Sequence, residues 1–125
     1  MMTERSLVSI VDDDQSVRES LPDLLDELGF AVQVFSSGEE FLASAWVDKT
    51  KCLILDIAMP GMSGPDLQQI LKRRGSKIPI IFVTAHGDDA VRPQMLKLGA
   101  VECLFKPFSD TALLSAINAA LPSGR

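Results

Sequence analysis

Short apolar runs alternate along the chain with longer segments in which apolar residues recur every three or four positions. The runs are too short for helices and rich in strand-forming residues, so they predict buried strands. The five runs are residues 6–11, 31–35, 52–55, 78–83 and 101–105. Strands that are apolar on both faces and alternate with helices are typical of a parallel sheet covered on both sides.

The segments between these runs carry the start and stop signals of helices. In residues 17–28 the apolar positions recur at helical spacing, Asp14 can act as the N-cap, and Gly29 can end the helix. Pro22 removes a backbone N–H inside this segment and predicts a kink or a restart of the helix. Further helices are expected over residues 38–42, 65–74 and 110–121.

The segment between the fourth and fifth strands gives the weakest helix signal. Asp88 and Asp89 could cap a helix there, but Pro93 is tolerated only in a first turn. We therefore expect this helix to start late, near Arg92, or to have a distorted beginning.

The length and the order of elements fit one domain. The chain has 125 residues, enough to bury a core, and contains about five βα units. We predict a single three-layer α/β domain with a five-stranded parallel sheet and helices on both faces. Residues 122–125 form the only linker-like stretch and are expected to be a tail or the start of a linker.

Polar side chains follow four of the predicted strands at the point where each strand ends. In an open α/β sheet, ligands bind beyond the carboxyl ends of the strands. The side chains at those ends are Asp12 and Asp13, Asp56, Thr84 and Lys106. Each alone would be an ordinary loop residue, but five at equivalent positions indicate a site.

The chemistry of this group favours a metal and a phosphoryl group. Three neighbouring carboxylates stay ionised only if a cation lies among them, and Mg²⁺ (or Mn²⁺) suits such oxygen ligands. Lys106 adds a fixed positive charge, and Thr84 could donate its hydroxyl to phosphoryl oxygens. Ala85 is small enough to leave an approach open.

Composition narrows the location and the partners. The formal net charge is −5, which argues against nucleic-acid binding by this domain itself. Cys52 and Cys103 lie in apolar runs, as buried free thiols of a reducing compartment do, so a cytoplasmic location is expected. No apolar run approaches the roughly 18 residues that span a bilayer, so no membrane partner is expected.

The site residues stand in four ordered motifs that together cover nearly the whole chain. The motifs are VDDD at residues 11–14, LDIAMPGMSG at 55–64, VTA at 83–85 and FKPF at 105–108. The set resembles the receiver domain of bacterial two-component response regulators, and is most similar to receivers that precede a LuxR-type helix-turn-helix output domain. The resemblance implies a doubly wound, flavodoxin-like fold with strand order 2-1-3-4-5. It also implies that the receiver domain covers residues 1–121.

The resemblance also implies roles for the carboxylates. Asp56 would accept a phosphoryl group from the phosphohistidine of a sensor histidine kinase or a phosphotransfer protein. Asp12 and Asp13 would hold Mg²⁺ together with Asp56 and the backbone carbonyl of Ala58. A carboxylate nucleophile needs its charge offset before it can attack an anionic donor, and a metal provides that offset.

The remaining site residues would act on the phosphoryl group once it is bound. Lys106 would pair with its oxygens, and Thr84 would move to hydrogen-bond them. A cis peptide bond between Lys106 and Pro107 would aim the ammonium inward. The expected function is a phosphorylation-dependent signalling switch with slow autodephosphorylation, not a turnover enzyme. Homodimerisation through the last helix–strand–helix face and transcriptional output through a DNA-binding domain beyond Arg125 are further expectations.

Some positions depart from the family pattern. Cys103 stands where the family usually has a switch aromatic, so either Thr84 moves without that partner, or Phe105 or another residue takes the role, or the switch is weak. The purely structural interpretation is that Cys103 fills a gap in the core. In the family, the positions of Ala58 and His86 flank the path of the attacking water; Ala58 cannot position water, whereas His86 is expected to tune hydrolysis.

Other functions fit the residues less well. A phosphatase of the haloacid-dehalogenase type needs a second acid at Ala58. A flavodoxin-like nucleotide site needs a first loop rich in Ser, Thr and Gly, whereas the acids at residues 12–14 would repel phosphate without a metal. A metal site from His86, Cys52 and Cys103 lacks closely spaced ligands. A receiver-like interaction module that is not phosphorylated stays open as the alternative, because of Cys103.

Overall fold

The computed structural model describes residues 5–121, and the predicted tail at 122–125 lies outside them. Strands and helices alternate as expected. In chain order the elements are β1 (Leu7–Val11), α1 (Gln15–Glu27), β2 (Ala31–Phe35), α2 (Gly38–Ala43), a 3-10 helix (Val47–Lys49), β3 (Cys52–Asp56), α3 (Gly64–Arg73), β4 (Ile80–Thr84), α4 (Val91–Lys97), β5 (Glu102–Phe105) and α5 (Asp110–Ala120).

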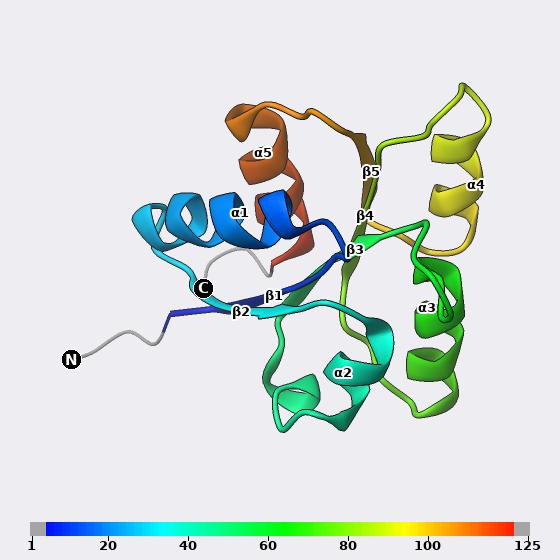
Figure 1. Ribbon diagram of the computed structural model, residues 1–125, viewed down its shortest axis with the longest axis horizontal. Coiled ribbons are helices and arrows are strands. Elements are labelled where there is room, and N and C mark those ends of the chain that lie inside the picture. Colours follow the sequence, from blue (N-terminus) through cyan, green and yellow to red (C-terminus); the bar gives the residue numbers. More distant parts are fainter. Residues whose placement is uncertain (1–4, 122–125) are drawn as a thin grey trace.

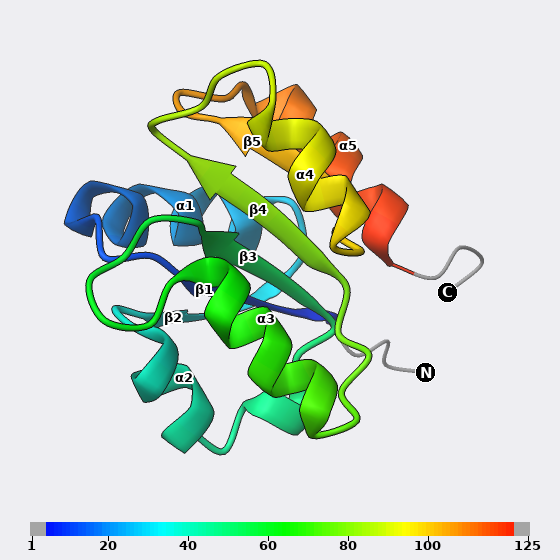
Figure 2. The same cartoon turned by 90° about the vertical axis from the view of Figure 1, so that its right-hand side faces the viewer.

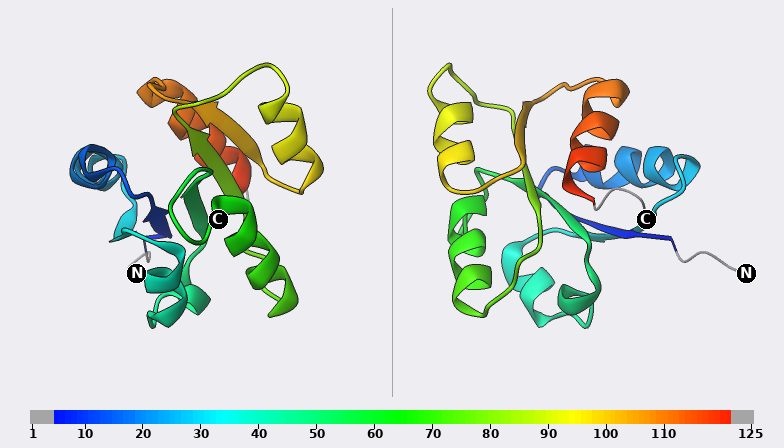
Figure 3. Two further views of the ribbon diagram at one scale, coloured as in Figure 1. Left: turned by 45° about the vertical axis from the view of Figure 1, so that its right-hand side comes forward. Right: turned by 180° about the vertical axis from the view of Figure 1, so that it is seen from behind.

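The strands form one parallel sheet in the order β2-β1-β3-β4-β5, which confirms the predicted fold. Helices α1 and α5 cover one face, and α2, α3 and α4 cover the other (Figure 1, Figure 2). Figure 3 shows the same layers from two further directions. Strands β1, β3 and β4 are buried along their whole length, because both of their faces are covered.

Two apolar clusters, one on each face, fill the space between sheet and helices. The cluster under α1 and α5 contains Val8, Ile10, Leu21, Leu25, Phe30, Cys52, Ile54, Ile81, Val83, Leu113, Ala116 and Ile117. The cluster under α2, α3 and α4 is built around Phe41, Leu55, Leu67, Phe82 and Met95, and includes Cys103. These clusters fix the strands in register, so that the loops at their carboxyl ends converge.

Local signals at the helix ends explain where most helices start and stop. The Asp14 side chain accepts a hydrogen bond from the Ser16 N–H, and Gly29 adopts a φ of +98° just beyond α1. Of the two outcomes predicted for Pro22, the restart is wrong, because one helix runs through it, and the kink stays a prediction. Among residues 5–121 no helix is long and apolar enough to cross a membrane.

Helix α4 begins late, as predicted. It starts at Val91, one residue from the predicted Arg92, and Pro93 falls in its first turn. Asp88 accepts a hydrogen bond from the Ala90 N–H, but no side chain caps the helix N-terminus itself. The segment between β4 and α4 therefore stays a loop of exposed residues, 85–90.

Gly64 lets the loop after β3 fold tightly beneath the site. Its N–H donates to the carbonyl of Ile57 at 2.9 Å, and α3 begins at this residue. A Cβ added at Gly64 would overlap the carbonyl oxygen of Asp56 and lie 3.1 Å from both the Cα of Ile57 and the ring of Phe82. Two of these neighbours are backbone atoms, which cannot rotate away.

We expect Gly64→Ala to lower the free energy of unfolding by about 2–3 kcal/mol, because the added methyl group must displace backbone. Gly29→Ala is the control: nothing lies within 4 Å of a Cβ there, and only its φ of +98° disfavours alanine, by roughly 1 kcal/mol. Urea unfolding of both variants measures this. A Gly64→Ala loss no larger than that of Gly29→Ala would contradict the packing argument.

Candidate functional site

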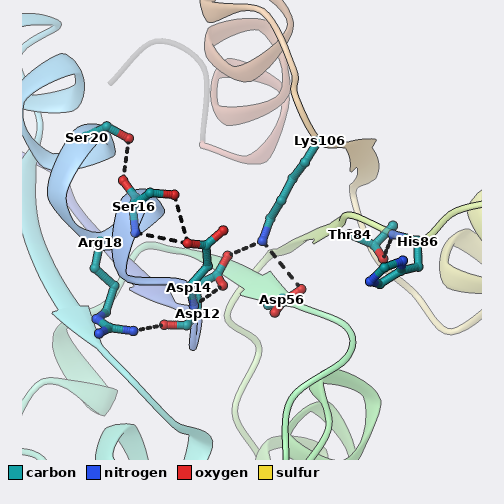
Figure 4. Close-up of polar contacts among 9 residues, drawn as sticks. All are labelled: Asp12, Asp14, Ser16, Arg18, Ser20, Asp56, Thr84, His86 and Lys106. Carbon is teal, nitrogen blue, oxygen red and sulfur yellow. Dashed lines mark hydrogen bonds and ion pairs between the residues drawn. The ribbon is translucent and has the colours of Figure 1, made fainter.

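The carboxyl ends of four strands bring the predicted side chains to one edge of the sheet. Asp12 follows β1, Asp56 ends β3, Thr84 ends β4 and Lys106 follows β5. Figure 4 shows Asp12, Asp56 and Lys106 pointing toward one another, while Thr84 lies apart from them at the end of its strand. The parallel direction of the strands is the reason, since it places all four ends on the same side.

Three carboxylates form the acidic part of the site. One oxygen each of Asp12, Asp13 and Asp56 lies within 4.8 Å of the others. Asp12 and Asp56 are buried, and Asp13 is exposed. The Asp14 N–H donates to Oδ1 of Asp12 at 2.9 Å, which fixes the orientation of that carboxylate.

The donor set fits a hard divalent cation. Oδ2 of Asp12 is buried, and its contact is with a cation, the Lys106 ammonium at 2.8 Å. Carboxylate oxygens are the ligands that Mg²⁺ and Mn²⁺ prefer. The three carboxylates could therefore hold a metal ion, with Asp13 on the side open to solvent.

Lys106 supplies a positive charge next to the buried carboxylates. Its ammonium lies 2.8 Å from Oδ2 of Asp12 and 3.8 Å from Oδ1 of Asp56. The predicted cis bond between Lys106 and Pro107 is present. The Lys106 N–H donates to the carbonyl of Thr84 at 2.8 Å, so the backbone that carries the lysine is tied to β4.

One ammonium does not offset the charge of the buried carboxylates. Burial raises the pKa of Asp56 to about 7, the negative charge of Asp12 adds to this, and Lys106 opposes it. Burial also acts to lower the pKa of Lys106, but the hydrogen bond and charge of Asp12 and the charge of Asp56 raise it overall. The site is short of positive charge, and a metal ion would supply it.

Thr84 belongs to the same edge but not to the same contacts. It is 2% exposed, and its hydroxyl accepts a hydrogen bond from the His86 N–H at 3.1 Å. In Figure 4 Thr84 and His86 lie apart from the group formed by Asp12, Asp56 and Lys106. Ala85 and His86 are exposed in the loop that follows β4. The hydroxyl would have to move to reach a group on Asp56.

Ala58 and Cys103 occupy different surroundings. Ala58 is exposed in the loop after Asp56, so it leaves that side of the site open, and its carbonyl as a metal ligand stays a prediction. Cys103 is 2% exposed within the cluster under α4, as the core interpretation expected. Burial, then the charge of Glu102, raises the pKa of its thiol, which disfavours a reactive role.

Cys52 takes no part in the site either. It is buried at the start of β3, and burial raises the pKa of its thiol to about 12. The candidate metal group found among residues 5–121 contains only the three aspartates, so Cys52, Cys103 and His86 are not brought together.

One residue near the site escaped prediction. The guanidinium of Arg18, on α1, donates to the backbone carbonyl of Asp12 at 2.9 Å and so braces the turn between β1 and α1 (Figure 4). A basic residue one turn into the helix after three acidic residues was the available signal. Helical spacing alone does not say that its side chain turns back toward the strand end.

Comparison with known proteins decides the family. The family model described as "Response regulator receiver domain" matches residues 8–118. The chain belongs to this family. It is 45% identical over 121 residues to the response regulator protein TodT of Pseudomonas putida, and 40% identical over 120 residues to the transcriptional regulatory protein FixJ of Azorhizobium caulinodans.

These relatives are longer than the receiver domain. The matches cover 97% of the chain and 53% of TodT, and 96% of the chain and 57% of FixJ. The chain thus spans about half the length of the curated relatives it matches. Among solved structures, the response regulator StyR superposes with a TM-score of 0.85 at 46% identity, over 94% of this receiver domain and 60% of StyR.

The raised pKa of Asp56 predicts a pH-dependent cost to stability. Between about pH 4 and pH 7 the folded protein keeps a proton that the unfolded chain, with an ordinary value of 3.8, has lost. The contribution of Asp56 to stability is therefore complete below pH 4 and is lost as the pH rises through 7. Asp56→Asn removes this titration and should be more stable than the wild type above pH 7, by on the order of 4 kcal/mol.

Urea unfolding in metal-free buffer at several pH values measures the difference. It should be near zero below pH 4 and grow toward pH 8. The exposed Asp23, on α1, provides the control, because Asp23→Asn makes the same substitution away from the site. A gap between Asp56→Asn and the wild type that does not change with pH would refute the assignment.

Proposed function

We propose that this receiver domain is a phosphorylation-dependent signalling switch in which Asp56 accepts the phosphoryl group. The observation that carries the proposal is the position of the Asp56 carboxylate: it is buried, has Asp12 and Asp13 within metal-ligand distance, and has the Lys106 ammonium 3.8 Å away. A carboxylate can attack an anionic donor only if nearby positive charge offsets the repulsion. Here Lys106 supplies part of that charge, and a metal held by the aspartates would supply the rest.

The transfer balances with groups present in the site and the donor. A carboxylate oxygen of Asp56 forms a bond to phosphorus while the bond from phosphorus to the donor's imidazole nitrogen breaks. The imidazole nitrogen keeps the electron pair and takes up a proton from water. Lys106, now 2.8 Å from Asp12, can pair with the phosphoryl oxygens because its side chain lies between Asp12 and Asp56. Thr84 approaches as the loop after β4 moves.

We infer that Mg²⁺ (or Mn²⁺) is the metal, held by Asp12, Asp13 and Asp56 with the backbone carbonyl of Ala58. When bound, it neutralises negative charge on the carboxylates and on the phosphoryl oxygens. The closeness of the three carboxylates and the shortage of positive charge around Asp56 support this.

The partners follow from the chemistry and from the family. The phosphoryl donor is a sensor histidine kinase or a phosphotransfer protein. Relatives such as FixJ are named as transcriptional regulators, which supports an output on transcription through an attached or partner DNA-binding domain. We place a phosphorylation-dependent homodimer contact on α4, β5 and α5. The domain is a phospho-acceptor with slow autodephosphorylation rather than a turnover enzyme, and its cytoplasmic location stays a prediction.

Incubation of the protein with acetyl phosphate and Mg²⁺ should add one phosphoryl group, detected as a mass increase that hydroxylamine removes. Asp56→Asn should abolish it, and Lys106→Ala should slow it, because the phosphoryl oxygens lose a counter-charge. Asp23→Asn should behave as the wild type. An unmodified wild type, or label that persists in Asp56→Asn, would contradict the proposal and favour the non-phosphorylated interaction module.

The lifetime of the phosphoryl group should depend on His86. The ring is exposed beside Thr84 in the loop after β4 (Figure 4). When this loop moves toward Asp56, the ring can shield a phosphoryl group there from water. We expect His86→Ala to lose the group severalfold faster than the wild type, in a decay assay after the donor is removed. The nearby exposed Asp89 serves as the control through Asp89→Asn. Decay that His86→Ala leaves unchanged would show that the histidine has no part in hydrolysis.

A further inference from the structure

Phe105 is a large aromatic residue next to Lys106 that has no part in the proposed metal site or in the phosphoryl transfer. It ends β5, its side chain is 40% exposed, and it is the register partner of Thr84 on β4. Cys103 lies two residues earlier, so both side chains point to the same face of the sheet, but Cys103 is buried. The aromatic ring on this face is therefore at the end of the strand, beside the loop that follows Thr84.

The ring of Phe105 rests directly on Gly87. A Cβ added at Gly87 would overlap Cε1 and Cδ1 of the ring. The backbone itself does not call for glycine, because Gly87 is not among the glycines with positive φ in residues 5–121, which are Gly29, Gly61, Gly75 and Gly99. Gly87 is suited to its position because an aromatic ring occupies the space of a side chain.

This contact joins β5 to a loop that is otherwise lightly held. Residues 85–90 are all exposed, and the hydrogen bonds described for their own groups run within the loop, to Thr84 or to α4. The backbone hydrogen bond from the Lys106 N–H to the Thr84 carbonyl fixes the start of this loop at β4. Phe105 and Gly87 hold it further out.

We propose that Phe105 is a latch. Its ring packs on Gly87 and holds the loop in the arrangement in which the Thr84 hydroxyl accepts a hydrogen bond from the His86 N–H. The Thr84 hydroxyl can bond a phosphoryl group on Asp56 only when the ring releases the loop. This inference rests on the proposed function, since it concerns the same site. Phe105 is a positioning residue, because it acts through the loop and does not touch the phosphoryl group.

The latch has a thermodynamic consequence. An interaction present only in the unliganded arrangement lowers the apparent affinity for any ligand that needs the other arrangement. Loss of either partner should therefore tighten binding at Asp56. Because the two residues act through one contact, the loss of both should add nothing to the loss of one.

Beryllofluoride, a phosphoryl mimic, tests this in the presence of Mg²⁺. Phe105→Ala and Gly87→Ala should each bind it about three- to tenfold more tightly than the wild type, and the double variant should match either single variant. Val34→Ala, at a 38% exposed apolar residue on β2, should leave the affinity unchanged. Unchanged or weaker binding in the single variants, or additive effects in the double variant, would overturn the latch.

A second measurement separates the latch from the proposed function. Without beryllofluoride, hydrogen exchange at the His86 amide should be faster in Phe105→Ala and in Gly87→Ala than in the wild type, while the buried amides of β3 should exchange as before. If the wild type binds no beryllofluoride, the proposed function fails and this exchange still judges the latch. Exchange at His86 that neither variant alters would exclude it.

Discussion

The burial of two carboxylates beside one ammonium is the constraint on which the site depends. Asp12 and Asp56 lie at the ends of strands that are buried along their length, so their negative charges are removed from most of the solvent. Lys106 reaches both from β5 but carries only one positive charge. The folded site thus has an excess of negative charge. A metal ion would reduce this excess, and a phosphoryl group on Asp56 would change which groups the ammonium contacts.

That imbalance couples chemistry to shape. Lys106 and Phe105 are neighbours in the chain, and the backbone of Lys106 is bonded to Thr84, so the same few residues hold the counter-charge and the loop after β4. When the Lys106 ammonium changes its contacts, the change therefore takes place next to Phe105, whose ring packs on Gly87. A short, lightly held loop can respond to such a change, whereas the buried strands cannot.

Periodicity was enough to place the strands and most helix ends, because buried parallel strands read as continuous apolar runs and because capping is local. It did not decide between a kink and a restart at Pro22, where packing of Leu21 and Leu25 on the sheet keeps one helix despite the missing hydrogen bond. It also missed Arg18, whose bond to the Asp12 carbonyl spans a turn between two elements.

The sequence by itself determined the α/β alternation, the resemblance to receiver domains and which side chains stand at strand ends. Only the tertiary structure decided which of them touch: Lys106 contacts Asp12 and Asp56, whereas the Thr84 hydroxyl turns to the His86 N–H. The physical reason is that strand ends fix where a side chain starts. Its direction depends on charge, burial and loop packing, which involve residues distant in the chain.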